Sequence, residues 1–536
     1  MKQNITRSLL GPLLSVTALA FSACNGRLPA SAQAPAQPGT PQDRSLAGTS
    51  CDDLARLNLP NTTITAAEEV AAGEFAPPKD RFSLPSPPGA PTPYGSLPPF
   101  CRVAGSITPV PESAIRFEVW LPKNWNGKFV GIGNGGTAGF IFYPDMAQPL
   151  SRGYAVGATD TGHSGGMADW SFVAHREKLI DNSYRAVHEM TDKSKAVVEA
   201  HYGSGANRSY WNGCSTGGRQ GLVAAHRFPE DYDGIIARAP AIKLTLQSAL
   251  LLEQAATDPI EPLTREKLKS LTEAAIAACD AADGVRDRTV TDPQSCMFDP
   301  GVLACKSGDG PDCLTPHQVT RVRQIYRDIQ DPRSGERVSL GLMPTSEVDW
   351  LPPPFASDMA RIATSYFQHV VFKDPTWEPS RLNLDAAVAH ARTLDDGVST
   401  TDPDLRSFVR RGGKLLLWHG WSDGAIAPLS TISYYDDVKS TVGEVQVADQ
   451  VRLFMAPGVR HCGGGEGPWQ VDYLSVIEQW VEGGKAPERL IASRPLGGAG
   501  TRTRPLCPYP QIAIYTGQGS SDEAGSFVCK PTSAKH

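Results

Sequence analysis

The sequence predicts an α/β fold in which a mostly parallel sheet is interrupted by a large insertion. Strand-like segments alternate with helical segments between residues 114 and 240, which is typical of parallel strands joined by crossover helices. This alternation stops over residues 241–400 and resumes after residue 401. A chain of 536 residues is long enough for several domains of about 100–200 residues each.

The expected elements follow one another in a regular order. In the first part of the chain, strands are expected at residues 115–121, 128–132, 154–159, 209–213 and 234–238, and helices at 186–201 and 216–226. In the last part, strands are expected at 414–419 and 451–456 and a helix at 471–482. Helical pieces, cysteines and Pro-rich loops lie between these parts. We therefore expect residues 51–240 and 401–536 to form one sheet domain, with residues 241–400 as a lid over it.

The N-terminal residues have the pattern of an export signal. A basic start precedes an apolar stretch that is shorter than the about 20 residues of a membrane span. Residues 1–23 are therefore expected to be a signal peptide, and the Ala- and Pro-rich residues 24–50 a flexible linker. Cys24 follows a sequence similar to a bacterial lipobox. The protein is thus expected to be periplasmic or secreted, either anchored through a lipid on Cys24 or cleaved nearby, for example after Ala32.

Charge and cysteine content narrow the classes of function. With a net charge of −6 and no basic stripe to neutralise phosphates, no nucleic-acid partner is expected. Without Cys24, ten of the 11 cysteines remain, and an even number in an exported chain predicts five disulfides. The alternative is a set of buried free thiols. The count does not determine the connectivity, but local spacing favours three pairs, Cys279–Cys296, Cys305–Cys313 and Cys507–Cys529.

Two segments match the G-x-S-x-G pattern of a serine nucleophile. In an α/β-hydrolase fold, this serine lies on a sharp turn directly between a strand and a helix. Ser215 meets the requirement, because it follows a strand-like segment and a helical pattern starts at Thr216. Ser164 meets it less well, because it is separated from its strand and no helical pattern follows at once. We therefore expect an α/β-hydrolase fold with a large inserted lid, Ser215 as the nucleophile, and Ser164 in a polar loop near the site.

A nucleophilic serine needs a base, and the base needs an acid to orient it. In this fold the three residues follow one another in the order Ser, acid, His. Asp423 follows one of the late strands and His461 follows the other, so they are the expected acid and base. His419 is a rival base, but its place at the end of a strand favours a packed or hydrogen-bonded structural role.

The tetrahedral intermediate needs N–H donors that are already in place for its oxyanion. The amide of Thr216, next to the nucleophile, is one candidate. The amide of Gly136, in a glycine run after an early strand, is the second candidate. The alternative for this glycine run is a simple tight turn.

A cysteine stands beside each expected catalytic residue, since Cys214 precedes Ser215 and Cys462 follows His461. If the triad forms, a disulfide between these cysteines would tie the two loops together. The Cys-Ser, later Asp and later His-Cys arrangement resembles the tannase and feruloyl esterase family, which also includes mono(2-hydroxyethyl) terephthalate hydrolase. The resemblance covers residues 51–529, and residues 367–375 are similar to a segment of the family's lid.

This resemblance implies an esterase that acts on galloyl, feruloyl or related aromatic acids. It also implies two disulfides beyond the three that spacing favours, Cys51–Cys101 and Cys214–Cys462. The lid is expected to provide aromatic walls for the substrate, for which four residues are available: Trp350, Tyr366, Phe367 and Trp377. The alternatives are a hydrolase of terephthalate-type or other small esters, a peptidase or lipase on the same fold, and an inactive surface binding protein.

A second site is expected in the lid. Asp280, Asp283 and Asp287 place hard oxygen ligands at short spacing, which suits calcium, although the spacing is not that of an EF-hand. By itself, this segment favours an acidic surface loop slightly over a metal site. The resemblance implies a structural calcium ion, bound by these three side chains and the carbonyls of Val285 and Thr289. No cofactor is expected for catalysis, and the oligomeric state is open.

Overall fold

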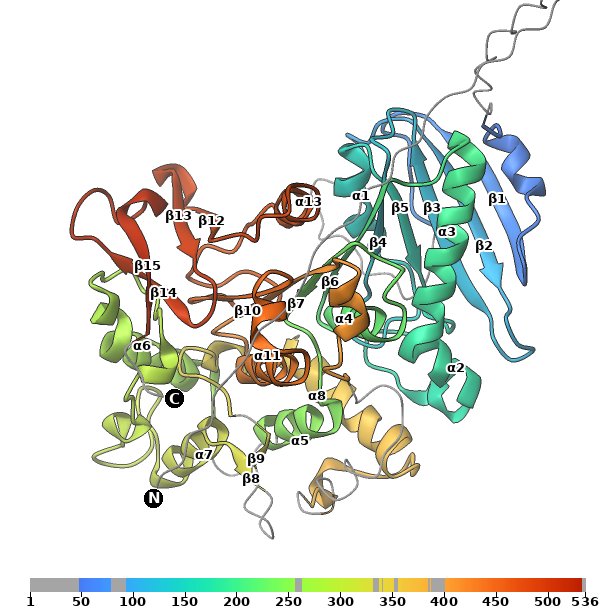
Figure 1. Cartoon of the computed structure of the whole chain (residues 1–536). Helices are drawn as coiled ribbons and strands as arrows, with labels where there is room; N and C mark the ends of the chain where they lie inside the picture. Colours follow the sequence, from blue (N-terminus) through green and yellow to red (C-terminus); the bar gives the residue numbers. More distant parts are fainter. Residues whose placement is uncertain are drawn as a thin grey trace, which may run out of the picture. The chain divides into compact units, whose positions relative to one another are not determined.

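A sheet of nine strands runs through the described part of the protein (Figure 1). Its strands lie in the spatial order β1 (Thr62–Val70), β2 (Phe100–Ile107), β3 (Ile115–Pro122), β5 (Ala155–Thr159), β4 (Lys128–Ile132), β6 (Arg208–Cys214), β7 (Gly234–Arg238), β10 (Lys414–Gly420) and β11 (Val451–Ala456). The neighbouring pairs β1–β2, β2–β3 and β3–β5 are antiparallel. The pairs from β5 to β11 are parallel. The predicted α/β fold is therefore confirmed.

The structure is a computed structural model. It describes residues 48–78, 93–255, 263–330, 337–339, 341–350, 355–383, 386 and 401–532. All of these belong to the unit formed by residues 46–536. The expected signal peptide, Cys24, and all but the last residues of the expected linker lie outside the described residues.

The strands and helices expected from the sequence are present, with bounds that differ by at most two residues. Within this nine-stranded sheet two strands were not expected, β1 and β2, which add an antiparallel extension to one edge. β1 is the edge strand and exposes several of its residues, so it lacks the apolar run of a buried strand. By contrast, every residue of β10 is buried, because helices cover both faces of the parallel strands.

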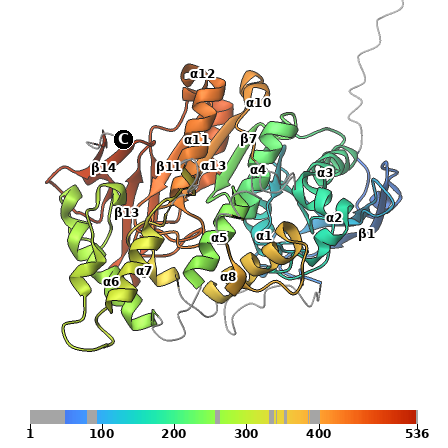
Figure 2. The same ribbon diagram turned by 90° about the horizontal axis from the view of Figure 1, so that it is seen from below.

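Helices pack on both faces of the sheet (Figures 1 and 2). On one face, α3 (Ala186–Tyr202), α4 (Thr216–Arg227) and α11 (Pro428–Val442) share a hydrophobic core with side chains such as Trp211 and Leu417. On the other face, α1 (Tyr143–Ser151) and α13 (Tyr473–Gly483) share a second core with Trp120 and Trp418. The sheet is thus held between two apolar layers, which makes its carboxyl-end loops a stable platform for a site.

The chain between β7 and β10 forms the region that we call the lid. Its larger described elements are α5 (Leu244–Ala255), α6 (Arg265–Cys279), α7 (Pro316–Tyr326), the short pair β8 (Ile329–Gln330) and β9 (Arg337–Ser339), and α8 (Phe355–Tyr366). These elements lie together below the strands in the view of Figure 1. Two apolar cores form in the lid, one around Tyr366 and Phe367, which Trp170 of the loop after β5 joins, and one around Leu271 and Val322, which Ala427 joins.

Two antiparallel hairpins follow the sheet near the C-terminus. They pair β12 (Leu490–Pro495) with β13 (Thr501–Leu506), and β14 (Gln511–Tyr515) with β15 (Phe527–Pro531). The sequence patterns did not predict these strands.

Ten cysteines form five disulfides, as the sequence predicts. The bonded pairs are Cys51–Cys101, Cys214–Cys462, Cys279–Cys296, Cys305–Cys313 and Cys507–Cys529. The three pairs that spacing favours and the two that the family resemblance implies are therefore all confirmed. They cross-link the edge of the sheet, the segments that follow β6 and β11, the lid and the last hairpin.

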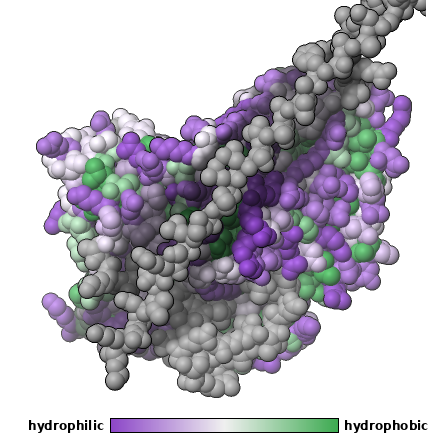
Figure 3. Space-filling view, in the orientation of Figure 1, coloured by the Kyte–Doolittle hydropathy of each residue, from purple (hydrophilic) through white to green (hydrophobic). Residues whose placement is uncertain are grey.

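The described surface on the face shown in Figure 3 is mostly hydrophilic, with hydrophobic residues scattered over it. Of the most exposed large apolar side chains, Met297 and Val302 lie close together in the lid sequence, and Val445 lies after α11. None of the helices in the described ranges combines the length and apolar character that crossing a bilayer requires.

Candidate active site

Ser215 occupies the turn between β6 and α4. Cys214 ends the strand and Thr216 begins the helix, so the serine is the single residue between them. Its φ of 60° and ψ of −123° are unusual for a residue with a side chain, and such strained backbone is typical of functional sites. The Ser215 N–H donates to the Arg238 carbonyl at 2.9 Å, which holds the turn against β7. This is the nucleophile elbow of an α/β-hydrolase.

Glycines make this sharp turn sterically feasible. A Cβ atom at Gly213 would lie 2.3 Å from the Gly217 carbonyl oxygen, and one at Gly217 would lie 2.9 Å from Gly133 Cα. Both distances are shorter than real Cβ contacts, so side chains at these positions would force the strand and helix apart. The G-x-S-x-G pattern around Ser215 is therefore a packing requirement of the elbow.

Ser164 has a different environment. It lies exposed in a loop after β5, and the next helical turn begins only at Ser171. The neighbouring His163 is buried and lies with Nε2 2.8 Å from the Thr137 carbonyl oxygen. The structure therefore places Ser164 in a polar loop, outside any strand-to-helix turn.

Asp423 and His461 form a buried hydrogen-bonded pair. His461 Nδ1 lies 2.7 Å from Asp423 Oδ2, and Asp423 Oδ1 accepts the N–H groups of Ala425 and Ile426 at 2.8 and 2.9 Å. Burial disfavours the imidazolium, but the Asp423 carboxylate outweighs this effect and raises the pKa of His461. For Asp423, burial by itself would raise the pKa. His461 and His419 outweigh this effect and hold the pKa of Asp423 well below its usual range. The pair thus consists of an ionised Asp423 carboxylate and a His461 imidazole whose basicity is raised.

His419 is the second imidazole on the same carboxylate. Its Nε2 lies 3.0 Å from Asp423 Oδ2 and 3.2 Å from the Ile426 carbonyl, and its Nδ1 lies 2.7 Å from Thr431 Oγ1. Because Nε2 faces two acceptors, we assign the proton to Nε2. The side chain is fully buried, so it is a hydrogen-bonded structural histidine, the role that its sequence position favours. That it binds the acid directly was not foreseen, and no sequence signal marks it.

The Cys214–Cys462 disulfide joins the nucleophile turn to the histidine loop. The two Cα atoms lie 6.0 Å apart although 248 positions separate the residues in the chain. Since Ser215 follows Cys214 and His461 precedes Cys462, the bond ties the turn of Ser215 to the loop of His461. The structure thus brings together the segments that carry Ser215, Asp423 and His461, the three residues that the sequence predicts for catalysis.

The glycine run after β4 packs directly on the elbow. Thr216 Oγ1 donates to the Gly136 carbonyl at 2.8 Å, and the Gly217 N–H donates to the Asn134 carbonyl at 2.7 Å. Gly136 has a φ of 54°. Within the described residues, the amides of Gly136 and Thr216 donate to no backbone carbonyl. The two expected oxyanion donors therefore belong to one hydrogen-bonded unit beside Ser215.

The expected aromatic walls of the lid are buried. Trp350, Tyr366, Phe367 and Trp377 are each at most 3% exposed. They pack inside the two apolar cores of the lid, Trp350 in one and the other three in the second. In this structure they stabilise the lid and present no open face to a substrate, contrary to the expectation from sequence.

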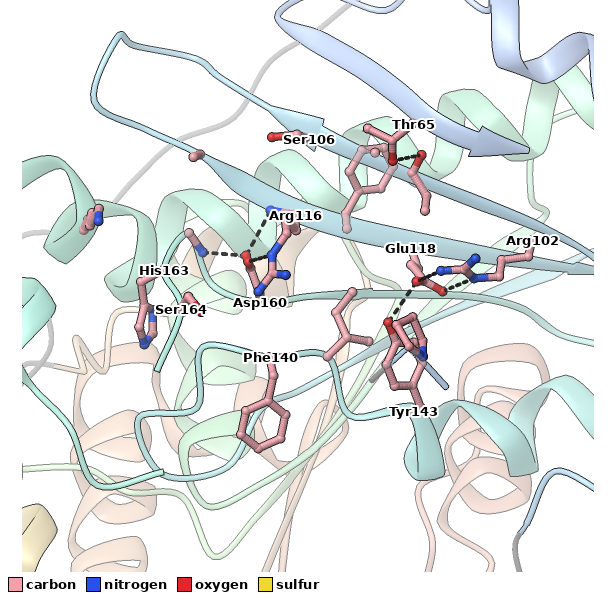
Figure 4. A pocket seen from close by; sticks show the side chains of 18 residues that line it. Thr65, Arg102, Ser106, Arg116, Glu118, Phe140, Tyr143, Asp160, His163 and Ser164 are labelled. Carbon is pink, nitrogen blue, oxygen red and sulfur yellow. Dashed lines mark hydrogen bonds and ion pairs between the residues drawn. The ribbon is translucent and has the colours of Figure 1, made fainter. Parts of the chain in front are cut away.

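A cavity of about 950 Å³ lies near the loop that carries Ser164 (Figure 4). Neither Ser215 nor His461 lines it. Four of its charged groups form two ion pairs, in which Arg116 Nε donates to Asp160 at 2.6 Å and Arg102 Nε donates to Glu118 at 2.9 Å (Figure 4). Because neither the elbow serine nor the histidine paired with Asp423 lines this cavity, we do not assign the active site to it.

The acidic lid loop places its three predicted ligands in buried positions. The Asp280 carboxylate accepts the N–H groups of Arg288 and Thr289 at 3.0 and 2.8 Å. Asp287 pairs with Arg504 from β13, and burial raises the pKa of both Asp287 and Asp283. A buried cluster of three carboxylates is costly without cations, so this donor set fits a hard cation such as calcium.

Two further observations bear on this loop. Thr289 Oγ1 is buried without a hydrogen-bond partner in the described structure. The oxygen atoms of the three carboxylates do not all lie within 4.8 Å of one another. Among the described residues, ligand atoms of Cys305, Asp309 and Cys313 do lie that close together, but the two sulfurs are bonded to each other.

The elbow, buried acid and histidine at the carboxyl ends of parallel strands define an α/β-hydrolase. Residues 101–530 match the family model described as tannase and feruloyl esterase. The chain is 35% identical to an uncharacterized esterase of Xanthomonas campestris, over 90% of this chain and 91% of that one. It is 31% identical to feruloyl esterase B of Aspergillus niger, over 88% of this chain and 94% of that one.

Solved structures agree with these sequence matches. Feruloyl esterase B from Aspergillus oryzae matches with a TM-score of 0.81 at 28% identity, over 90% of this chain and 99% of that one. The tannin acyl hydrolase from Aspergillus niger shares the fold, with a TM-score of 0.72 at 24% identity, over 88% and 92%. The chain belongs to the tannase and feruloyl esterase family, and the protein is a carboxylic ester hydrolase.

Proposed function

We propose that the protein is an exported serine esterase that hydrolyses esters of aromatic acids through an acyl-enzyme on Ser215. The observation that carries this proposal is the disulfide between Cys214 and Cys462, which ties the turn of Ser215 to the loop of His461, the histidine that is hydrogen-bonded to Asp423. The names of the relatives, feruloyl esterase B and tannin acyl hydrolase, support an aromatic acyl group.

The reaction follows from the geometry of these groups. His461 Nε2 takes the proton of the Ser215 hydroxyl while Oγ attacks the ester carbonyl carbon. Asp423 orients the ring through Nδ1 and stabilises the imidazolium. His461 then returns the proton to the departing alcohol oxygen as the tetrahedral intermediate collapses to the acyl-enzyme. A water molecule repeats these steps, and the aromatic acid leaves with Ser215 restored.

The oxyanion of both tetrahedral intermediates is assigned to the amides of Thr216 and Gly136. Thr216 is the first residue of α4, so its N–H adds to the positive end of the helix dipole. The hydrogen bond from Thr216 Oγ1 to the Gly136 carbonyl supports a fixed relation between the two amides. Donors that are held in place before the reaction stabilise developing charge most effectively.

A panel of purified esters tests the activity. We expect turnover of methyl ferulate or methyl gallate at about 1–10³ per second, as is usual for enzymes on good substrates. A monoester of terephthalic acid and a peptide amide serve as comparisons. Faster turnover of the terephthalate monoester would assign the protein to that substrate class instead. Binding of aromatic esters without turnover would contradict the proposal and favour an inactive binding protein.

An exported location is supported by the five disulfides. Such bonds form and persist in oxidising compartments outside the cytoplasm. The signal peptide of residues 1–23 and the lipid anchor on Cys24 stay predictions, because both lie outside the described residues.

We also propose that the acidic lid loop binds a structural calcium ion through Asp280, Asp283 and Asp287, with the carbonyls of Val285 and Thr289. The burial of these carboxylates supports this assignment. The loop also contacts the sheet domain, since Arg502 Nη1 donates to the Asp287 carbonyl at 2.9 Å. The ion would therefore order both the lid and its contact with the sheet domain.

Removal of calcium is expected to destabilise the lid. Chelation should lower the melting temperature, because the buried carboxylates lose a shared counter-ion and, in the described structure, only Asp287 keeps an ion pair, with Arg504; added calcium should restore it. Asp283→Asn is expected to weaken calcium binding measured by titration calorimetry. Asp299→Asn, a change at an exposed lid carboxylate paired with Arg323, is the matched control. Equal melting temperatures with and without chelator would contradict the assignment.

A further inference from the structure

The lid reaches the catalytic acid through the segment of residues 345–350. Thr345 Oγ1 lies 2.7 Å from Ser422 Oγ, the hydroxyl next to Asp423, and both side chains are buried. Thr345 has a φ of 81°, which is unusual for a β-branched residue and marks a tightly determined backbone. The first contact is thus a buried hydrogen bond between the lid and the turn that carries the acid.

The second contact is close packing on the other side of Asp423. A Cβ atom at Gly424 would lie 2.8 Å from Asp349 Cβ and 3.0 Å from the Ser346 carbonyl oxygen. The lid backbone therefore lies directly against this turn, with no room for a side chain at position 424. Residues on both sides of the catalytic acid are in contact with the same lid segment.

The third contact reaches the histidine loop. Arg460, the residue before His461, donates from Nη1 to Asp349 Oδ1 at 3.0 Å. The Asp349 side chain is 9% exposed, whereas that of Arg460 is 44% exposed. Burial raises the pKa of Asp349 to about 6, against the opposing effect of Arg460. A buried carboxylate of the lid thus lies beside the catalytic pair.

This segment is fixed to the body of the lid. Glu347, in the short 3₁₀ helix η7 (Glu347–Asp349), is fully buried. Its carboxylate accepts the Thr272 hydroxyl of α6 at 2.7 Å, the Thr345 N–H at 2.8 Å, and the Tyr326 hydroxyl of α7. The contacts to Ser422, Gly424 and Arg460 therefore connect two lid helices to the catalytic loops.

We infer that Asp349 is a positioning residue for His461, and that the lid completes the catalytic site by supplying it. This inference rests on the proposed function, because it assigns Asp349 a role in the same reaction. Through Arg460, Asp349 fixes the loop that carries the base. Through its packing on Gly424, it fixes the turn that carries the acid.

The charge of Asp349 adds an electrostatic effect that a purely mechanical contact would lack. The charged and titratable groups that face His461 are Asp423 from the turn after β10 and Asp349 from the lid. Behind them lie Arg460 on Asp349 and His419 on Asp423. Both carboxylates raise the pKa of His461 and favour the imidazolium that forms during attack. Removing the charge of Asp349 therefore lowers this pKa.

Asp349→Asn tests the inference with the pH profile of kcat/KM for an aromatic ester. The acid limb reports protonation of the free enzyme's base, so we expect it to move to lower pH by about half a unit to one unit. We expect kcat to fall about 10-fold because His461 is less well held. Asp349→Glu, which keeps the charge, should restore the wild-type acid limb. Asp299→Asn changes an exposed lid carboxylate that is paired with Arg323, so its acid limb and its kcat should both match those of the wild type.

Arg460→Met removes the exposed partner of the same ion pair. It therefore tests the inference even if Asp349→Asn does not fold. We expect a lower kcat with an unchanged KM, and no additional loss in the double variant. An unaltered acid limb in Asp349→Asn, or an unaltered kcat in Arg460→Met, would overturn the inference. A wild-type protein that hydrolyses no aromatic ester would instead overturn the proposed function.

Discussion

Replacing Ser215 with alanine is expected to lower kcat for aromatic esters by about 10⁴- to 10⁶-fold, as loss of the nucleophile does in other serine hydrolases. Ser215 is the residue between β6 and α4. It also follows Cys214, which is bonded to Cys462 in the histidine loop. The variant is expected to keep its fold, because alanine removes one hydroxyl and leaves the backbone unchanged. Initial rates and thermal melting measure the two effects.

Ser164→Ala is the matched control for this experiment. It removes a hydroxyl from the second G-x-S-x-G segment, where Ser164 is exposed and lies in a loop. We expect near wild-type kcat in this variant. Loss of activity in Ser164→Ala, with activity kept in Ser215→Ala, would reverse the site assignment.

The second large effect is expected from removing the disulfide beside the triad. Changing Cys214 and Cys462 together to alanine should lower the free energy of unfolding by about 5 kcal/mol, because the bond closes a loop with a sequence separation of 248. The same change releases the nucleophile turn from the histidine loop, so kcat should fall as well. Chemical denaturation and initial rates measure these quantities.

The disulfide of Cys305 and Cys313 provides the control. Its sequence separation is only 8, so its removal should cost about 2–3 kcal/mol by the same loop-closure argument. Because this bond lies in the lid, away from the elbow, kcat should change little. Equal effects of the two double variants on kcat would show that the bond between Cys214 and Cys462 has no special role in positioning the catalytic residues.

Much of the sheet could be predicted from sequence, because its parallel strands are apolar runs followed by turns. β10 is the clearest case, since all its residues are buried. β1 could not be predicted in this way, because an edge strand that exposes part of its length lacks that signal. The C-terminal hairpins were missed for a related reason, since β12 and β13 are only six residues long and neither is a continuous buried run.

The candidate catalytic residues could be singled out in the sequence because chain order and adjacent cysteines restrict them. Ser215, Asp423 and His461 each follow a strand whose pattern is visible. The surroundings of these residues could not be predicted, because they depend on the packing of distant segments. His419 contacts the acid only because β10 aims its ring inward, and Asp349 reaches Arg460 only because of how the lid folds.

The lid aromatics show the same limit. Their residue types suit an aromatic substrate, but residue type does not reveal which face a ring presents. Tyr366 and Phe367 follow one another in sequence, yet both are fully buried in one core. Their large apolar area stabilises the lid, so composition alone led to the wrong expectation.

Trapping the acyl-enzyme tests the central claim most directly. The protein is mixed with an excess of an activated aromatic ester, quenched in acid within the first turnovers, and digested for peptide mass spectrometry. We predict that the acyl mass is found on the peptide that contains Ser215, and that it is absent from Ser215→Ala. An acyl group on Ser164, or turnover of the ester with no covalent adduct, would contradict the account.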